Sequence, residues 1–179
     1  MAAWFKLPRR WSVDSAIAKL QHPKEPHRLN AAIWIWSRNA GHFSDEQRMR
    51  LIDVLKATAT ADESDAVRDQ SICALVRLQA PGATDLALGA LRDPDPRTRS
   101  TVAAALGPTG DLRIVDQLIA LLDDDDGYVR EGAALGLSTQ NDPRAIDPLR
   151  AMLERGEQDS GAKAAAKRAI ASLKRAARV

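Results

Sequence analysis

The chain has 179 residues, a formal net charge of +2 and a single cysteine, so one domain is expected and an internal disulfide is excluded. No uncharged apolar run approaches the ~18 residues that a membrane span needs, and no apolar segment follows the basic N-terminus as in a secretory signal. We therefore expect a soluble cytoplasmic protein, in which so small a net charge gives no argument for nucleic-acid binding.

The first predicted element is a short helix that begins after Ser12, whose hydroxyl can accept hydrogen bonds from the first free backbone N–H groups. Its apolar residues share one face, and it lacks a first-helix partner of its own. We expect residues 1–22 to form an N-terminal cap that covers the end of a helical stack.

A tryptophan-rich helix follows a proline-punctuated turn, in the segment RLNAAIWIWSRN. When Arg28 is aligned with the arginines of later segments, Trp34 falls where those segments have alanine or glycine. The tryptophans expected to gather at this end of the chain are Trp4, Trp11, Trp34 and Trp36. Two interpretations stay open: an aromatic plug between the cap and the first repeat, or an exposed patch in which Trp34 and Trp36 bind a partner.

Two further segments complete the first repeat and begin the second. The segment SDEQRMRLIDVLKATA opens with a capping box formed by Ser44 and Gln47, and it ends a repeat that we place at 26–58. The next repeat is expected at 62–92, with a first helix from residue 65 to residue 78 and a short second helix after it.

The middle of the chain then repeats itself at a spacing of 31 residues, with the same residue at 12 of 32 aligned positions. A period of about 20 to 50 residues marks an array in which each unit buries its apolar face against the next. Each copy contains two helical segments: in the second copy Asp126 can cap the first, and Asp142 followed by Pro143 begins the second. These repeats are expected at 93–122 and 124–155.

The pattern V-R-x-x-A-A-x-x-L, then N-D-x-R-A-I-x-x-L, resembles the short HEAT repeats of the phycobilisome-lyase type. Its carriers are Val129, Arg130, Ala133, Ala134, Leu137, Asn141, Asp142, Arg144, Ala145, Ile146 and Leu149. The resemblance implies an all-α fold, a right-handed α-α superhelix (HEAT-like solenoid) of about four to five helix pairs with helical caps. It also implies a structural ladder between neighbouring repeats, made by Asp93, Arg99, Asp124 and Arg130.

The C-terminal segment 159–179 is expected to be a capping helix. Lys167 and Arg168 replace Ala134 and Leu135 of the preceding copy, as suits a helix on which nothing stacks. Residues 80–127 hold nine acidic and four basic residues, whereas the last 20 residues hold six basic and no acidic ones. The molecule should therefore be electrically bipolar, and this field either steers a partner or only maintains solubility.

No residue pattern favours catalysis, a metal or a cofactor. The acidic run 123–126 lacks the ligand spacing of a calcium loop and coincides with capping positions. The histidines, His22, His27 and His42, occur without a His-Glu dipeptide, and Cys73 has no histidine near it in sequence, which favours a buried structural thiol. We expect a non-enzymatic protein.

The favoured function is a protein-interaction scaffold or adaptor that presents the concave surface of its second helices to a protein or peptide. If Ile146, Leu149 and Leu153 face the core, charged residues of the same helix must face outward. The expected partner-binding residues of the two matched repeats are Arg113, Asp116, Gln117, Arg144, Asp147 and Arg150. A merely solvated face is the alternative interpretation of this row, and the oligomeric state stays open.

Two other functions stay open for a chain of this resemblance. One is a nucleic-acid-binding HEAT-like protein, which the expected row of Asp85, Asp116 and Asp147 disfavours because carboxylates repel phosphate. The other is a lyase or chaperone-type subunit related to phycobilin lyases, for which the sequence offers no chromophore-contacting motif.

Overall fold

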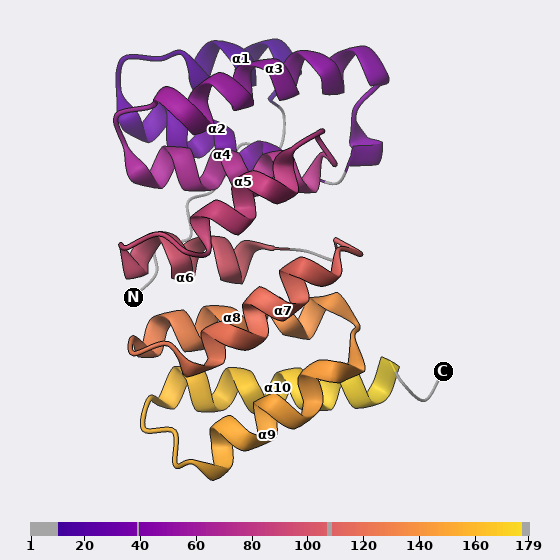
Figure 1. Ribbon diagram of the computed structural model, residues 1–179. Helices are drawn as coiled ribbons and strands as arrows, with labels where there is room; N and C mark the ends of the chain where they lie inside the picture. The colour runs from indigo at the N-terminus through magenta and orange to yellow at the C-terminus, as the bar shows by residue number, and fades with distance from the viewer. Residues whose placement is uncertain (1–10, 39, 107–108, 177–179) are drawn as a thin grey trace. The chain divides into compact units, whose positions relative to one another are not determined.

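The computed structural model describes residues 11–38, 40–106 and 109–176, and within them the secondary structure is helical, without strands (Figure 1). The expected all-α fold is therefore confirmed. The chain divides into two compact units, Met1–Ala80 and Pro81–Val179. The prediction of one continuous solenoid over 1–179, with Trp4 in its N-terminal cap, stays a prediction, and Trp4 lies outside the described residues.

In its described residues, 11–38 and 40–80, unit 1 contains four α-helices and one short 3₁₀ turn. They are α1 (Val13–Leu20), α2 (Glu25–Trp36), η1 (Ala40–His42), α3 (Asp45–Ala61) and α4 (Asp65–Arg77). The two predicted caps are confirmed: Ser12 accepts from the backbone N–H of Ser15, and Ser44 and Gln47 form a reciprocal capping box. Helix α2 packs on α1 and α4, and α3 packs on α4, around a core of fully buried Ile35, Leu51, Leu55 and Leu75.

Unit 2 contains the two copies of the 31-residue repeat and the last helix. Its elements are α5 (Ala83–Ala90), α6 (Pro96–Ala105), α7 (Leu112–Ala120), η2 (Leu121–Asp123), α8 (Gly127–Gln140), η3 (Pro143–Ala145), α9 (Ile146–Glu154) and α10 (Ser160–Ala176). Within this unit α6, α8 and α10 pack side by side as one layer, and α5, α7 and α9 lie in a second layer (Figure 1). The first helix of each repeat therefore contacts the first helix of the next.

Glycine brings α8 unusually close to α6. A Cβ atom added at Gly132 would lie 2.6 Å from the carbonyl oxygen of Ser100, and one at Gly136 would collide with the carbonyl oxygen of Ala103. Because these neighbours are backbone atoms, they cannot rotate away as a side chain would. The small residues of the repeat pattern thus set the distance between successive first helices.

The last repeat departs from the expected single second helix. Asp142 accepts from the backbone N–H of Arg144, which confirms the predicted cap, but residues Pro143–Ala145 form a 3₁₀ turn before α9 begins at Ile146. Pro148 explains this geometry, because it has no N–H to donate to the carbonyl four residues earlier. Leu149 and Met152 are buried, whereas Ile146 and Leu153, which were expected to face the core with Leu149, are only partly buried.

Candidate functional site: a charged face on the second helices of unit 2

The second helices of unit 2 carry charged side chains that recur with the sequence repeat. We call them the second-helix face; its members are Asp85, Arg113, Asp116, Gln117, Arg144, Asp147 and Arg150. Arg113 donates to Asp85 at 3.0 Å, and Arg144 donates to Asp116 at 2.9 Å. Each bridge joins side chains 28 residues apart, so the second bridge reproduces the first one repeat later.

Each of these two arginines is also held by the aspartate that caps the element on which it lies, α7 for Arg113 and the 3₁₀ turn η3 for Arg144. Arg113 donates to Asp111 at 2.8 Å, and Arg144 donates to Asp142 at 2.8 Å. These hydrogen bonds lower the pKa of Asp111 and of Asp142 below the usual range, so both carboxylates stay ionised well below neutral pH. The two guanidinium groups are therefore fixed in place by carboxylates on two sides.

The remaining members of the face have local partners. Asp147 accepts from Arg150 at 2.9 Å within α9, and the side-chain oxygen of Gln117 accepts from Arg92 at 2.9 Å. The ion-paired side chains remain in contact with water, since Arg113 is 60% and Asp85 is 72% exposed. The face is an ordered but accessible pattern of alternating charge.

Small residues lie one helical turn beyond the aspartates of this face. They are Gly89, Ala120 and Ala151, each four residues after its aspartate and on the same side of its helix. No atom outside the local chain lies within 4 Å of the Cβ position at Gly89. The charged row is thus bordered by small residues, which leave room for the main chain of a partner to approach.

A second set of arginines connects the repeats from within. Arg99 donates to both carboxylate oxygens of Asp124 at 2.9 Å and to the carbonyl oxygens of Asp93 and Pro94. In unit 1, Arg28 similarly donates to Asp62 at 2.7 and 3.0 Å. These pairs are largely buried, in contrast to those of the second-helix face.

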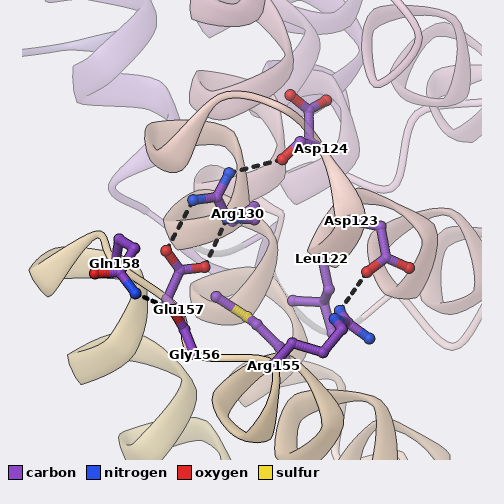
Figure 2. Close-up of a pocket in the computed structure, with 9 residues that line it drawn as sticks. Leu122, Asp123, Asp124, Arg130, Arg155, Gly156, Glu157 and Gln158 are labelled. Carbon is purple, nitrogen blue, oxygen red and sulfur yellow. Dashed lines mark hydrogen bonds and ion pairs between the residues drawn. The ribbon is translucent and has the colours of Figure 1, made fainter.

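Arg130 makes the corresponding contacts in the last repeat, at the edge of a pocket of about 270 Å³ (Figure 2). It donates to Glu157 at 2.6 and 2.8 Å and to the carbonyl oxygens of Asp124 and Asp125. The hydrogen bonds from Arg130 lower the pKa of Glu157, whose side chain is 3% exposed. Asp123 and Arg155 pair across the same pocket. These charged side chains of the pocket thus pair with one another, which indicates a structural contact between successive helices rather than a ligand site.

Glu157 was not among the residues predicted for this ladder. Asp62, Asp93, Asp124 and Glu157 each accept a hydrogen bond from the backbone N–H two residues later. The sequence signal that locates the acidic partner is therefore an acidic residue six positions before the ladder arginine, or before the lysine that takes its place. Before α10 this residue is Glu157, six positions before Lys163. It follows Asp124 by 33 residues rather than by the repeat spacing of 31, because the loop before α10 is two residues longer.

The aromatic residues of unit 1 form a compact cluster. The ring of Trp34 lies 6.1 Å from that of Trp11 and 6.2 Å from that of Phe43, and the guanidinium of Arg38 lies 3.8 Å above Trp34. Trp34 is 3% exposed, and Trp36 is partly exposed. This burial of Trp34 favours the aromatic plug over the docking patch.

The histidines and the cysteine are engaged in local structure. The ring of His22 accepts from the backbone N–H of Lys24 and stacks on His27, and His42 also has an interaction partner. Burial raises the pKa of the Cys73 thiol, so the thiol stays protonated. Among the described residues, no three His, Cys, Asp or Glu side chains are grouped to hold a metal ion, and no helix is long and apolar enough to cross a membrane.

Comparison with known families identifies the repeat. The family model for HEAT repeats matches residues 52–138 and 85–171, which together span most of the chain. The chain belongs to the HEAT-repeat family. With the helical layers of the two units, this establishes the HEAT-like solenoid fold that the sequence pattern implied.

Solved structures show the same HEAT-like architecture. The complex of CpcE and CpcF of phycocyanin lyase from Nostoc sp. PCC7120 is 22% identical, with a TM-score of 0.64 over 98% of this chain and 70% of that one. An engineered protein is 20% identical, with a TM-score of 0.57 over 92% and 80% of the two chains. A designed armadillo repeat protein is 18% identical, with a TM-score of 0.52 over 90% and 82%. No curated protein matches the sequence. These identities show a shared fold and no more.

Proposed function

We propose that this HEAT-repeat protein is a non-enzymatic scaffold that binds a protein or peptide partner on its second-helix face. The observation that carries the proposal is the repeated bridge, Arg113 to Asp85 and Arg144 to Asp116, at the spacing of one repeat. Neither helix capping nor core packing requires an arginine that reaches to the preceding second helix. A repeated pattern of alternating charge can instead match complementary charges at the same spacing on a partner.

Arg113 and Arg144 are already immobilised by ion pairs, and this preorganisation favours binding. A long exposed arginine normally loses rotamer freedom when a partner immobilises it, at a cost of about 0.5–1.5 kcal/mol per side chain. Here Arg113 and Arg144 are each held by two carboxylates before any partner arrives. A preordered surface of this kind binds with a smaller entropic penalty.

The test is recovery of a partner from the native cell with the full-length protein as bait. Reversal of Arg113 and Arg144 to glutamate together should weaken recovery of a partner that wild type retains, while circular dichroism shows unchanged helix content. The matched control reverses Lys56 and Arg77, two exposed residues whose side chains form no hydrogen bond or ion pair with the described residues. The proposal fails if the control variant loses the partner equally or if the double reversal keeps it in full.

The likeness to the CpcE–CpcF complex favours one second candidate, a subunit of a heteromeric lyase or chaperone. This candidate rests on the fold alone. A change in the absorbance spectrum of a free bilin on addition of the protein would support it, and an unchanged spectrum would count against it. Nucleic-acid binding is the less favoured alternative, because Asp85, Asp116 and Asp147 lie exposed on the same helices.

A further inference from the structure

The exposed side of α10 carries five cations whose side chains form no ion pair or hydrogen bond with the described residues. They are Lys163, Lys167, Arg168, Lys174 and Arg175, and all five are exposed. Among the eight arginines of residues 81–159, six form ion pairs within the chain. These six are Arg99, Arg113, Arg130, Arg144, Arg150 and Arg155. The cations of α10 thus differ from those of the repeats before it.

The buried side of α10 shows which direction these cations face. Ala162, Ala165, Ala166, Ala169 and Leu173 are buried and share one side of the helix, which packs on α8 and α9. At 3.6 residues per turn, the cations fall on the opposite side in two rows. One row holds the three lysines, and the other holds Arg168 and Arg175. The α10 basic face, as we call these five residues, therefore points away from the packed helices.

The spacing along the two rows is that of another helix. Lys167 and Lys174 are seven residues apart, as are Arg168 and Arg175, which corresponds to about 10.5 Å along the axis. Carboxylates seven residues apart on a partner helix have the same spacing. The backbone of nucleic acid has one phosphate per ~3.4 Å of each strand, a much denser series of charges. Between the rows lie Ala164 and Ala171, whose small side chains allow a partner helix close approach.

The charge of the surrounding unit restricts the length of the partner. Residues 81–159 hold 15 acidic and eight basic residues, a net charge of −7, whereas α10 carries five basic and no acidic residues. The basic face extends over at most about 25 Å, the length of a 17-residue helix. A long polyanion or an anionic membrane would also come within the Debye length, about 8 Å at physiological salt, of the acidic repeats, and their carboxylates would repel it there.

We propose that the α10 basic face binds an acidic helical segment of a partner protein, with carboxylates spaced seven residues apart. This site is separate from the second-helix face, so either proposal can fail without the other. It gives the chain a second point of attachment, at the end of unit 2.

The test is fluorescence anisotropy of labelled helical peptides with the full-length protein. One peptide carries pairs of glutamates every seven residues, and a second has the same composition with the pairs every five residues. The seven-residue peptide should bind at least about tenfold more tightly. Lys167→Glu with Arg168→Glu should reduce its affinity at least about tenfold, whereas Lys56→Glu with Arg77→Glu, a matched change of charge in unit 1, should change it less than about twofold.

A second variant, Lys163→Glu with Lys174→Glu, gives an independent measurement at the two ends of the lysine row and should also weaken the peptide. Equal affinity for the two peptides, equal loss in the control variant, or no peptide binding would overturn the proposal. A short DNA duplex or phosphatidylserine vesicles that bind more tightly than the peptide in the same buffer, and lose affinity with the α10 variants, would also overturn it. That result would assign the face to nucleic acid or to a membrane.

Discussion

Replacement of Arg130 by alanine tests whether the buried arginines hold successive repeats together. Arg130 is 19% exposed and donates to both oxygens of Glu157 and to two carbonyl oxygens. Its removal leaves the 3%-exposed carboxylate of Glu157 with hydrogen bonds from its own loop, such as the N–H of Asp159 at 2.7 Å. Loss of one partner of a buried pair costs ~3–5 kcal/mol, and partial access of water reduces this, so we expect a loss of about 3 kcal/mol.

Urea unfolding followed by circular dichroism measures this loss. Arg113→Ala is the comparison, because that arginine is 60% exposed and should leave the midpoint nearly unchanged. Glu157→Gln in the Arg130→Ala background should recover part of the loss, since it removes the unpaired charge. An Arg130→Ala midpoint equal to that of wild type would refute the account of the ladder.

The remaining predictions concern packing, pH and the thiol. Gly136→Ala should lower the free energy of unfolding by about 1–2 kcal/mol because its Cβ meets a carbonyl of α6, whereas Gly89→Ala, in open space, should raise it by up to about 1 kcal/mol; urea melts decide both signs. The pKa of Glu157 is lowered in the folded state from its unfolded value of 4.5, so the ionised carboxylate stabilises the fold above that pH. The free energy of unfolding should therefore decrease as pH falls from about 4.5 through the folded pKa, and Glu157→Gln should make this decrease smaller. Cys73 should react with a thiol reagent only after unfolding, because it is buried and protonated; rapid reaction of the native protein would contradict its placement.

The fold was predictable because the sequence repeats the residues that a helical stack requires. The caps at Ser12, Ser44, Asp126 and Asp142 depend on contacts within a few residues, and the structure contains each of them. The 3₁₀ turn before α9 was missed, although Pro148 carries its cause, because the two matched copies suggested identical helices. Local hydrogen bonding at a proline outweighed the similarity of the copies.

The candidate site was less predictable, because its pairings join residues about one repeat apart. The outward direction of Arg113 and Arg144 follows from helical spacing. Their ion pairs with aspartates of the preceding second helix depend on the distance between successive second helices, which the sequence does not give. Glu157 was missed because the position one repeat after Asp124 is Arg155, and only the structure shows that the longer loop moves the acid by two residues. The cations of α10 were expected as a polar cap, and their lack of partners among the described residues is visible only in three dimensions.

The most direct test of the scaffold proposal exchanges one bridge of the second-helix face without a change in net charge. Asp116→Arg combined with Arg144→Glu keeps an ion pair between the same positions but inverts the charge pattern that a partner meets. We predict unchanged helix content by circular dichroism, a urea midpoint lowered by the loss of the Arg144–Asp142 pair, and loss of the partner that the wild-type protein recovers from its native cell. A variant that remains folded and recovers this partner as well as wild type does would contradict the proposal that the second-helix face binds it.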